Sequence, residues 1–349
     1  MKRYLYTLVN GQRRDIFALA ITTIFIPFSW IYRFIVVFLR AAYARSIIFS
    51  KRVSVPVISI GNLTMGGSGK TPTAIFITKM LLAKKRKPAI ILRGYKSGSG
   101  FSNDSDEQMM MAQTLPDVTV MANPDRYQAA TEIIKHGQAD VIILDDGFQH
   151  WRLQRNLDIV LVDCVNPFGN GQVIPAGILR EPVSALHKAD IIMLTKSDLG
   201  NTADIRKRIA RSFPDALLVE TIHSPKSVTD IYSNQSCDLR RVISPVIAFC
   251  AIGDPVSFKS TLLSLGADIK EFVPFLDHHE YDVKDMQRIK DLCQAIGITT
   301  VITTAKDAVK LKNFGELWSG ITVYKLNIEI QVVKGYQEFS QRIAHVLGG

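Results

Sequence analysis

The sequence predicts an α/β protein built on a doubly wound parallel sheet, and three observations support this prediction. Short runs rich in valine and isoleucine recur along the chain without alternating with polar residues, as in strands buried on both faces. Helical segments lie between some of these runs. A glycine-rich loop ending in lysine follows the first run and leads into a helix, which is the context of a P-loop.

The order of the predicted elements is strand, helix, strand, which is typical of a doubly wound sheet. Helices are predicted at Thr73–Lys85 and Arg126–His136. The strands are expected at Val55–Ile60, Ala89–Leu92, Val118–Met121, Val141–Leu144, Ile159–Val162 and Ile191–Leu194.

A change in composition at Ile222–Ser244 divides the chain, because this segment is polar and is expected to be a linker. We therefore predict three parts: a membrane-docking segment at 1–52, a P-loop domain at 53–225, and a smaller α/β lobe at 226–349 that closes over the active site. In the smaller lobe, a helix is expected at Val283–Ala295 and strands at Val246–Ile252, Thr299–Thr304 and Ile321–Leu326.

The composition fits a globular protein with reduced thiols. With 47% hydrophobic and 21% charged residues, the 349-residue chain can bury a sizeable core. None of its four cysteines belongs to a CxxC pair, so neither a zinc site nor a disulfide framework is indicated.

Positive charge is concentrated at the N-terminus. Residues 1–52 contain nine Lys or Arg and one acid, so they carry most of the net charge of +10. This excess lies beside the apolar stretches Ile16–Tyr32 and Phe34–Leu39 and not around a predicted cleft. We therefore expect an anionic membrane surface as the partner and no nucleic acid.

The apolar stretch is open to four interpretations. Ala42-Tyr43-Ala44 resembles a signal-peptide cleavage site, but the stretch is too long and contains arginine. A membrane span would be at the short limit of length and would contain Pro27, and a buried core helix is also possible. An interfacial helix fits best, because residues such as Trp30 can insert while nearby basic residues meet head groups.

The strongest motif is the glycine-rich loop. Its glycines let backbone N–H groups surround a phosphate, and the helix that follows adds its partial positive charge. Lys70 would reach the β- and γ-phosphates, and Thr71 would bind Mg²⁺. Thr64 stands where the usual pattern has its first glycine. The expected nucleotide-binding residues are Thr64, Met65, Gly66, Gly67, Ser68, Gly69, Lys70 and Thr71.

Two further strand ends carry polar motifs. The run Val141–Leu144 leads into Asp145 and Asp146, in the manner of a Walker B element that holds magnesium. The sequence Thr195-Lys196-Ser197-Asp198 matches the [NT]-K-x-D pattern with which GTPases read guanine. This second motif leaves open an alternative function as a GTPase or a metallochaperone-like switch protein.

Together these motifs resemble the tetraacyldisaccharide 4′-kinase family. The resemblance rests on segments between positions 61 and 281, and the N-terminal apolar segment also fits. In this family a Thr or Ser at the position of Thr64 is normal. The matching segments are Gly61-Asn62-Leu63-Thr64, Leu92-Arg93-Gly94-Tyr95, Asp145-Asp146-Gly147-Phe148-Gln149-His150, Pro175-Ala176-Gly177-Ile178-Leu179-Arg180-Glu181-Pro182 and Asp277-His278-His279-Glu280-Tyr281.

The resemblance implies that residues 53–225 form a kinase domain that uses ATP and Mg²⁺. The implied acceptor is the 4′-hydroxyl of a tetraacylated glucosamine disaccharide 1-phosphate, an intermediate of lipid A biosynthesis. Such an acceptor stays in the bilayer, so the enzyme is expected at the cytoplasmic face of the bacterial inner membrane, as a peripheral or monotopic protein.

The resemblance also assigns roles to residues. Asp106 and His278 are implied to act together on the acceptor hydroxyl, although Asp106 lacks the flanking Gly and Pro of the family's GDEP-like segment. Asp106 is expected on a polar connecting loop. The implied metal ligands are Thr71, Asp145, Asp146 and Glu181, and the implied substrate contacts are Arg93, Tyr95, Glu107, Arg126, Gln149 and Arg180.

Overall fold

The computed structural model describes residues 15–94 and 106–348, which form two compact units. The first unit contains the described residues up to 94 together with 115–222 and 330–348. The second contains 106–114 and 223–329. Two strands, β7 (Leu217–Asp230) and β12 (Thr322–Lys334), each carry the chain from one unit into the other.

The first unit is built on a parallel sheet, as the sequence predicts. Its central strand β1 (Val57–Asn62) pairs in parallel with β4 (Val141–Asp145) on one side and β5 (Leu157–Asp163) on the other. The strand order is β7-β6-β5-β1-β4-β2-β3. The remaining strands are β2 (Pro88–Leu92), β3 (Thr119–Ala122) and β6 (Ile191–Thr195).

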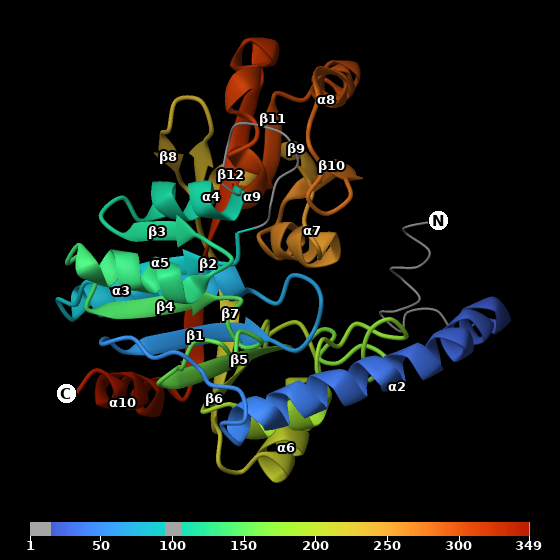
Figure 1. The fold of residues 1–349 in the computed structure, drawn as a ribbon. Helices are drawn as coiled ribbons and strands as arrows, with labels where there is room; N and C mark the ends of the chain where they lie inside the picture. The colour runs from blue at the N-terminus through green and yellow to red at the C-terminus, as the bar shows by residue number, and fades with distance from the viewer. Residues whose placement is uncertain (1–14, 95–105, 349) are drawn as a thin grey trace. The chain divides into compact units, whose positions relative to one another are not determined.

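Helices cover this sheet because both of its faces are apolar (Figure 1). On one face, α5 (Arg126–Lys135) packs Ala129, Ala130 and Ile133 against the sheet in a core that includes Ile91 and Leu144. Further helices of this unit are α3 (Lys70–Ala83), the 3₁₀ helix η1 (Val183–Lys188), α6 (Thr202–Ser212) and α10 (Tyr336–Val346).

Helix α10 belongs to the first unit although it follows the second unit in sequence. The ring of Phe339 stacks on that of Phe76 in α3, with 6.2 Å between centroids. Arg86 donates a hydrogen bond to the carbonyl oxygen of Leu347 at 3.2 Å. The first unit is therefore completed by a segment that lies far along the chain from its other elements.

The N-terminal helix α2 (Ile16–Ala44) is continuous through Pro27 and Arg33. Its segment Ala20–Ala44 is long and apolar enough to cross a membrane, by length and composition only, and 11% of its most apolar window is buried. Large apolar side chains such as Trp30 and Phe34 are exposed, at 67% and 72%. A buried core helix is thus excluded for this stretch.

One face of α2 does pack on the first unit. Ser29 is fully buried; its hydroxyl donates to the carbonyl oxygen of Val173 and accepts from the N–H of Ala176. Further along, the ring of Tyr43 contacts that of Trp151, at 5.9 Å between centroids. The helix is therefore attached through contacts of residues from Ser29 to Tyr43, while most of its large apolar residues are exposed.

The strands of the second unit pair in parallel in the order β10-β9-β11-β12, with an apolar core on each face. Alternate residues of β9 point to opposite cores: Phe249 packs with the side chains of α8, and Ala248 packs with those of α7. The elements are α4 (Asp106–Thr114), β8 (Ser236–Cys237), η2 (Leu239–Val242), β9 (Pro245–Cys250), α7 (Pro255–Ser264), β10 (Asp268–Pro274), α8 (Val283–Ile296), β11 (Thr300–Thr304), α9 (Ala305–Ala308) and η3 (Lys312–Trp318).

Two local predictions are wrong. The segment expected to be a linker is largely structured, because β7 runs on to Asp230 and pairs with the short antiparallel strand β8. The prediction took its polar residues as a sign of a linker. A strand with one partly exposed face also contains polar residues. Asp106 is the first residue of α4 and not part of a loop. Acidic residues suit the first turn of a helix, where they interact with its partial positive charge.

Candidate active site

The phosphate-binding loop connects β1 to α3 in the first unit. Gly66 and Gly69 have φ values of 118° and 88°, which side chains other than glycine rarely adopt, so these two positions require glycine. Gly69 is the N-cap of α3, and the helix begins at Lys70. The loop therefore places the first-turn N–H groups and the lysine at one end of the helix, as anion binding requires.

A second segment holds this loop in place. The N–H of Met65 donates to the carbonyl oxygen of Ile178 at 2.8 Å, and the N–H of Arg180 donates to that of Leu63 at 2.7 Å. The Ile178–Arg180 stretch lies within the PAGILREP motif. The two motifs are thus joined through their backbones.

Asn62, the last residue of β1, organises the loop from inside and is fully buried. Its amide nitrogen donates to the hydroxyl oxygen of Ser68 at 2.7 Å and to that of Thr64 at 3.3 Å. Its amide oxygen accepts from the ammonium group of Lys70 at 3.3 Å. Sequence reasoning included this residue in a motif but gave it no role.

The two carboxylates after β4 have different surroundings. Asp145 is 4% exposed and accepts a hydrogen bond from the hydroxyl of Thr71 at 3.3 Å. Asp146 has a φ of 54° and forms an ion pair with Arg180 at 2.7 Å and another with Lys70 at 3.6 Å. Arg126 donates to the carbonyl oxygens of both aspartates, at 3.2 Å each.

These cations control the charge of Asp146. Burial by itself raises the pKa of this carboxyl, but Lys70, Arg180 and Arg126 lower it by more, so the net pKa lies below its ordinary value. Asp146 is therefore an anion at neutral pH, with two cationic side chains fixed around it.

The side chains of Thr71 and Asp145 fit a magnesium ion. A hydroxyl and a carboxylate oxygen are the hard ligands that Mg²⁺ prefers, and the ion usually completes its shell with water and phosphate oxygens. Among the described residues no group of three or more His, Cys, Asp or Glu could hold a metal by itself. The donor set thus suits an ion that arrives with a phosphate.

Glu181, a second predicted metal ligand, is fully buried and has polar partners from two other segments. Arg40 of α2 forms an ion pair with its carboxylate, and the side chain of Gln149 donates to the other carboxylate oxygen at 3.1 Å. Gln149 also donates to the backbone oxygen of Asn62 at 2.9 Å. Burial raises the pKa of Glu181, and Arg40 and Gln149 oppose this rise.

The second unit contains a separate cluster of charged residues around the start of α4. Lys310 is 5% exposed in its side chain; its ammonium group pairs with the carboxylate of Asp106 and donates to the carbonyl oxygen of His279, at 2.9 Å each. Lys306 lies 3.4 Å from a carboxylate oxygen of Glu107. It also lies 3.4 Å from the ring nitrogen of His278.

Asp106 and His278 thus belong to one cluster, but within the described residues no hydrogen bond joins them directly. Each is held by its own lysine, Asp106 by Lys310 and His278 by Lys306. His278 is also unusual in its backbone, with a φ of 60°. Such a conformation is uncommon outside glycine and occurs often at functional sites.

The neighbouring His279 has the structural role. Its ring accepts or donates a 2.7 Å hydrogen bond with Asp285 and stacks on Phe275, and it lies 5.5 Å from the ring of Tyr281. The side chain of His278, by contrast, is 56% exposed. The packing contacts of the Asp277–Tyr281 motif thus leave His278 accessible to a ligand.

Other predicted site residues lie outside these two groups. Arg93 is exposed at the end of β2, and the following Gly94 has a φ of 57°. Tyr95 lies outside the described residues. In the Thr195–Asp198 motif the lysine is not accessible from the surface. Lys196 is 2% exposed, and its ammonium group pairs with Asp163 at 2.6 Å.

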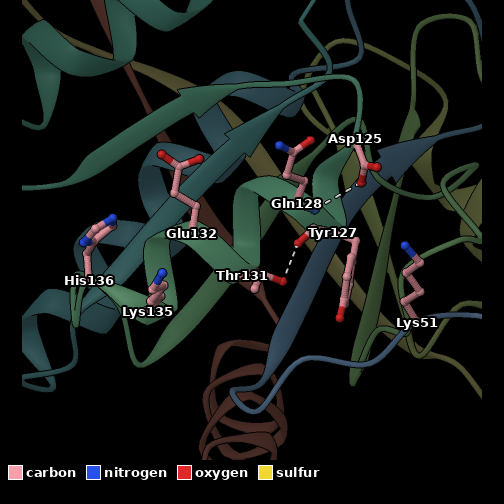
Figure 2. A pocket seen from close by; sticks show the side chains of 8 residues that line it. All are labelled: Lys51, Asp125, Tyr127, Gln128, Thr131, Glu132, Lys135 and His136. Atoms are coloured by element: carbon pink, nitrogen blue, oxygen red, sulfur yellow. Dashed lines mark hydrogen bonds between the residues drawn. The ribbon is translucent and has the colours of Figure 1, made fainter.

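A surface depression of about 500 Å³ lies away from the phosphate-binding loop, on the outer side of α5 (Figure 2). Two of its polar side chains make hydrogen bonds within the helix itself. Asp125 caps α5 by accepting from the N–H of Gln128, and Thr131 donates to the carbonyl oxygen of Tyr127. Lys51 lies over the ring of Tyr127, at 4.5 Å from its centroid. No set of catalytic groups converges on this depression among the residues that line it.

Sequence reasoning missed five residues of these groups. Asn62 could have been found, because it stands at the end of the strand before the loop. The other four come from distant parts of the chain and no local pattern marks them. They are Tyr32, Arg40, Lys306 and Lys310.

Comparison with known proteins identifies close relatives over the whole chain. The sequence model of the LpxK family, described as tetraacyldisaccharide-1-P 4′-kinase, matches residues 21–348. A tetraacyldisaccharide 4′-kinase of Halothermothrix orenii is 33% identical and covers 98% of this chain and 97% of its own. One from Elusimicrobium minutum is 36% identical over 83% of this chain and 82% of its own.

A solved structure agrees. The crystal structure of LpxK from Aquifex aeolicus, in complex with ATP, superposes with a TM-score of 0.73 at 28% identity. The match covers 92% of this chain and 98% of that one.

Proposed function

Because the chain belongs to the tetraacyldisaccharide-1-P 4′-kinase family, we propose that it phosphorylates the 4′-hydroxyl of a tetraacylated glucosamine disaccharide 1-phosphate with ATP. The observation that carries this proposal is the pairing of the two nucleotide motifs in the first unit. The hydroxyl of Thr71 meets the carboxylate of Asp145, and Lys70 stands beside Asp146. This arrangement suits a nucleoside triphosphate and its Mg²⁺.

The chain's own residues would act on charge and on a proton. Lys70 and the cationic side chains around Asp146 would stabilise the negative charge that spreads over the transferred phosphoryl group. Mg²⁺, when bound, would neutralise part of the same charge, with Thr71 and Asp145 as its protein ligands.

The acceptor needs a base, because a sugar hydroxyl is a poor nucleophile near neutral pH. Asp106 is the proposed acceptor of the proton, with His278 as its partner. Lys310 supports this role, since it fixes the Asp106 carboxylate and makes a bond to the backbone next to His278. Arg93, Tyr95, Glu107, Arg126, Gln149 and Arg180 remain proposed contacts of the substrate, and Asp146 and Glu181 remain proposed metal ligands.

The function is tested by acceptor-dependent turnover. The purified full chain is incubated with Mg²⁺ and either ATP or GTP, with and without the disaccharide acceptor in detergent micelles. The kinase predicts that ATP is consumed only when the acceptor is present and that one phosphate is added to it. Acceptor-independent hydrolysis of GTP would instead support a GTPase.

We also propose that α2 docks the enzyme on the cytoplasmic face of the bacterial inner membrane. The support is its exposed large apolar side chains, which include Phe28, Trp30, Phe34 and Phe38. The concentrated positive charge of residues 1–52 adds to it, at about 1 kcal/mol for each basic residue near an anionic surface, screened by salt.

Membrane extraction distinguishes the modes of attachment. If α2 lies in the interface, high salt or carbonate should release at least part of the full chain from membranes. A spanning helix would resist both treatments. A full chain that stays in solution and does not bind anionic vesicles would contradict membrane docking altogether.

A further inference from the structure

Two lines of contact begin on α2 and end at Lys70 of the phosphate-binding loop. The first starts at Arg40, which pairs with Glu181, and Glu181 accepts from Gln149. Gln149 then donates to the backbone oxygen of Asn62, whose side chain bonds Lys70. Every link in this line is a hydrogen bond or an ion pair between polar groups that are buried or partly buried.

The second line starts two helical turns earlier, at Tyr32. Its hydroxyl donates to the carbonyl oxygen of Arg180 at 3.1 Å. The guanidinium of Arg180 contacts both carboxylate oxygens of Asp146 at 2.7 Å, and Asp146 lies 3.6 Å from Lys70. Tyr32 and Arg40 are eight positions apart, so they lie on the same face of α2.

The environment of Arg40 shows that this contact is not a surface ion pair. Its side chain is 15% exposed and that of Glu181 is 1% exposed. The guanidinium also lies over the ring of Phe148, at 4.6 Å from the centroid, and Phe148 is fully buried beside the Walker B aspartates. A carboxylate buried to this degree needs a cation to remain charged.

Gln149 depends on Glu181 for its orientation. Its amide nitrogen makes both of its hydrogen bonds, to Glu181 and to Asn62, while its amide oxygen is buried without a hydrogen-bond partner among the described residues. If Arg40 no longer held the Glu181 carboxylate in place, Gln149 would lose a fixed acceptor for its amide nitrogen, and the amide could turn over. Asn62 would then lose one of the contacts that hold it under the loop.

We propose that Arg40 is a positioning residue of the phosphate site, which acts through Glu181 and Gln149 on Asn62 and the phosphate-binding loop. The inference rests on the proposed kinase function and extends it. Helix α2 is then one wall of the site as well as the docking segment, so a chain without it would lose nucleotide binding even when no membrane is present.

The test compares two variants that remove one positive charge from the same helix. Arg40→Met removes the cation beside Glu181, and Arg33→Met removes an exposed one. Any loss of electrostatic attraction to a membrane is therefore shared by both. Turnover is measured with the acceptor in neutral detergent micelles, and the affinity for the Mg²⁺ complex of a non-hydrolysable ATP analogue is measured by calorimetry without any acceptor.

We expect Arg40→Met to lower kcat and to weaken binding of the analogue, each by about tenfold, as for loss of a charge-assisted contact. Arg33→Met should match the wild type within twofold in both measurements. Equal values for the two variants would overturn the proposal.

Two further variants decide the outcome if Arg40→Met does not fold. Arg40→Lys keeps the charge but loses the planar guanidinium, so kcat and analogue affinity should lie between those of the wild type and a tenfold loss. Glu181→Gln removes the group through which Arg40 acts, so adding Arg40→Lys to it should cause no further loss. A further loss of the same size would show that Arg40 acts by another route, against the proposal.

The calorimetric arm separates this inference from the proposed function. If the wild type failed to phosphorylate the acceptor, the proposed function would fail. Calorimetry would still show whether Arg40 controls the phosphate site.

Discussion

The two charged groups of this protein differ in how the chain assembles them. In the first unit, Lys70, Thr71, Asp145 and Asp146 come from two contiguous motifs, each at the end of a buried strand. In the second unit, the cluster draws on residues 106–107, 277–278 and 306–310, which are far apart in sequence. A site made from adjacent strand ends can therefore be predicted from sequence, whereas a site assembled by the packing of distant segments cannot.

The groups also differ in electrostatic balance. Around Asp146, two cations share one carboxylate, which leaves positive charge available to a phosphate. Around Lys306, two carboxylates and one histidine share one ammonium group. The first arrangement leaves positive charge for an anion, whereas the second places an excess of carboxylate around one cation.

The largest effect is expected at the phosphate-binding loop. Lys70→Ala should lower kcat at least a thousandfold, because this side chain carries the charge nearest the transferred group. The variant should fold normally, since Lys70 is partly exposed and its contacts are polar. Circular dichroism and thermal unfolding check the fold, and wild-type turnover in a folded variant would contradict the assignment of the loop.

The cluster of the second unit is tested next. Asp106→Ala and His278→Ala should each lower kcat by a hundredfold or more, within the usual range for loss of a general base. If the two act together, the double variant should lose little more than either one. Binding of the ATP analogue should be nearly unchanged in all three. Fully additive losses would show two independent residues, and a normal kcat in either single variant would exclude it from catalysis.

A smaller effect is expected at Lys310, whose ion pair holds the Asp106 carboxylate in place. Lys310→Met should lower kcat about tenfold with little change in KM for ATP, because Asp106 loses the group that fixes its carboxylate. Lys310→Arg should recover part of this loss. Lys312→Met is the matched control, since that side chain is exposed two positions away. Equal kcat values for the Lys310 and Lys312 variants would remove Lys310 from the site.

The smallest effect concerns stability and not turnover. Burial, with Arg126 and Arg155 nearby, lowers the pKa of His150 to about 4 from a usual value near 6.5. The neutral ring is therefore favoured by the fold, so its contribution to stability is complete above pH 6.5 and is lost as the pH falls toward 4. Urea unfolding at pH 7 and pH 5 should show a smaller pH effect in His150→Gln than in the wild type. An unchanged pH dependence would contradict this.

Sequence alone could predict the parallel sheet, the loop and the Walker B strand, because each is encoded by residues that are neighbours in the chain. For example, β4 was expected at Val141–Leu144 and occurs at Val141–Asp145. The start of α3 was expected near Thr73 and occurs at Lys70, since the phosphate-binding loop itself caps the helix. The family could be named from the same motifs, and the comparisons confirm it.

The remainder depends on contacts that no local pattern shows. Arg40 and Glu181 are 141 positions apart, and Tyr32 and Arg180 are 148 apart. In sequence, Arg40 was one of nine basic residues of an apolar and positively charged segment, with nothing to separate it from Arg33. Only the packing of α2 on the first unit shows that one arginine is buried beside a carboxylate and the other is exposed.

Helix α10 brings the end of the chain back into the first unit, so this unit is completed late during synthesis. The stacking of Phe339 on Phe76 joins two positions separated by the entire second unit. During synthesis on the ribosome, the first unit cannot be completed until residues 330–348 have emerged. The second unit, which apart from α4 is the continuous stretch 223–329, can reach its own packed state earlier. The nucleotide-binding half of the enzyme, although it begins first, should therefore be the last part to become resistant to proteolysis.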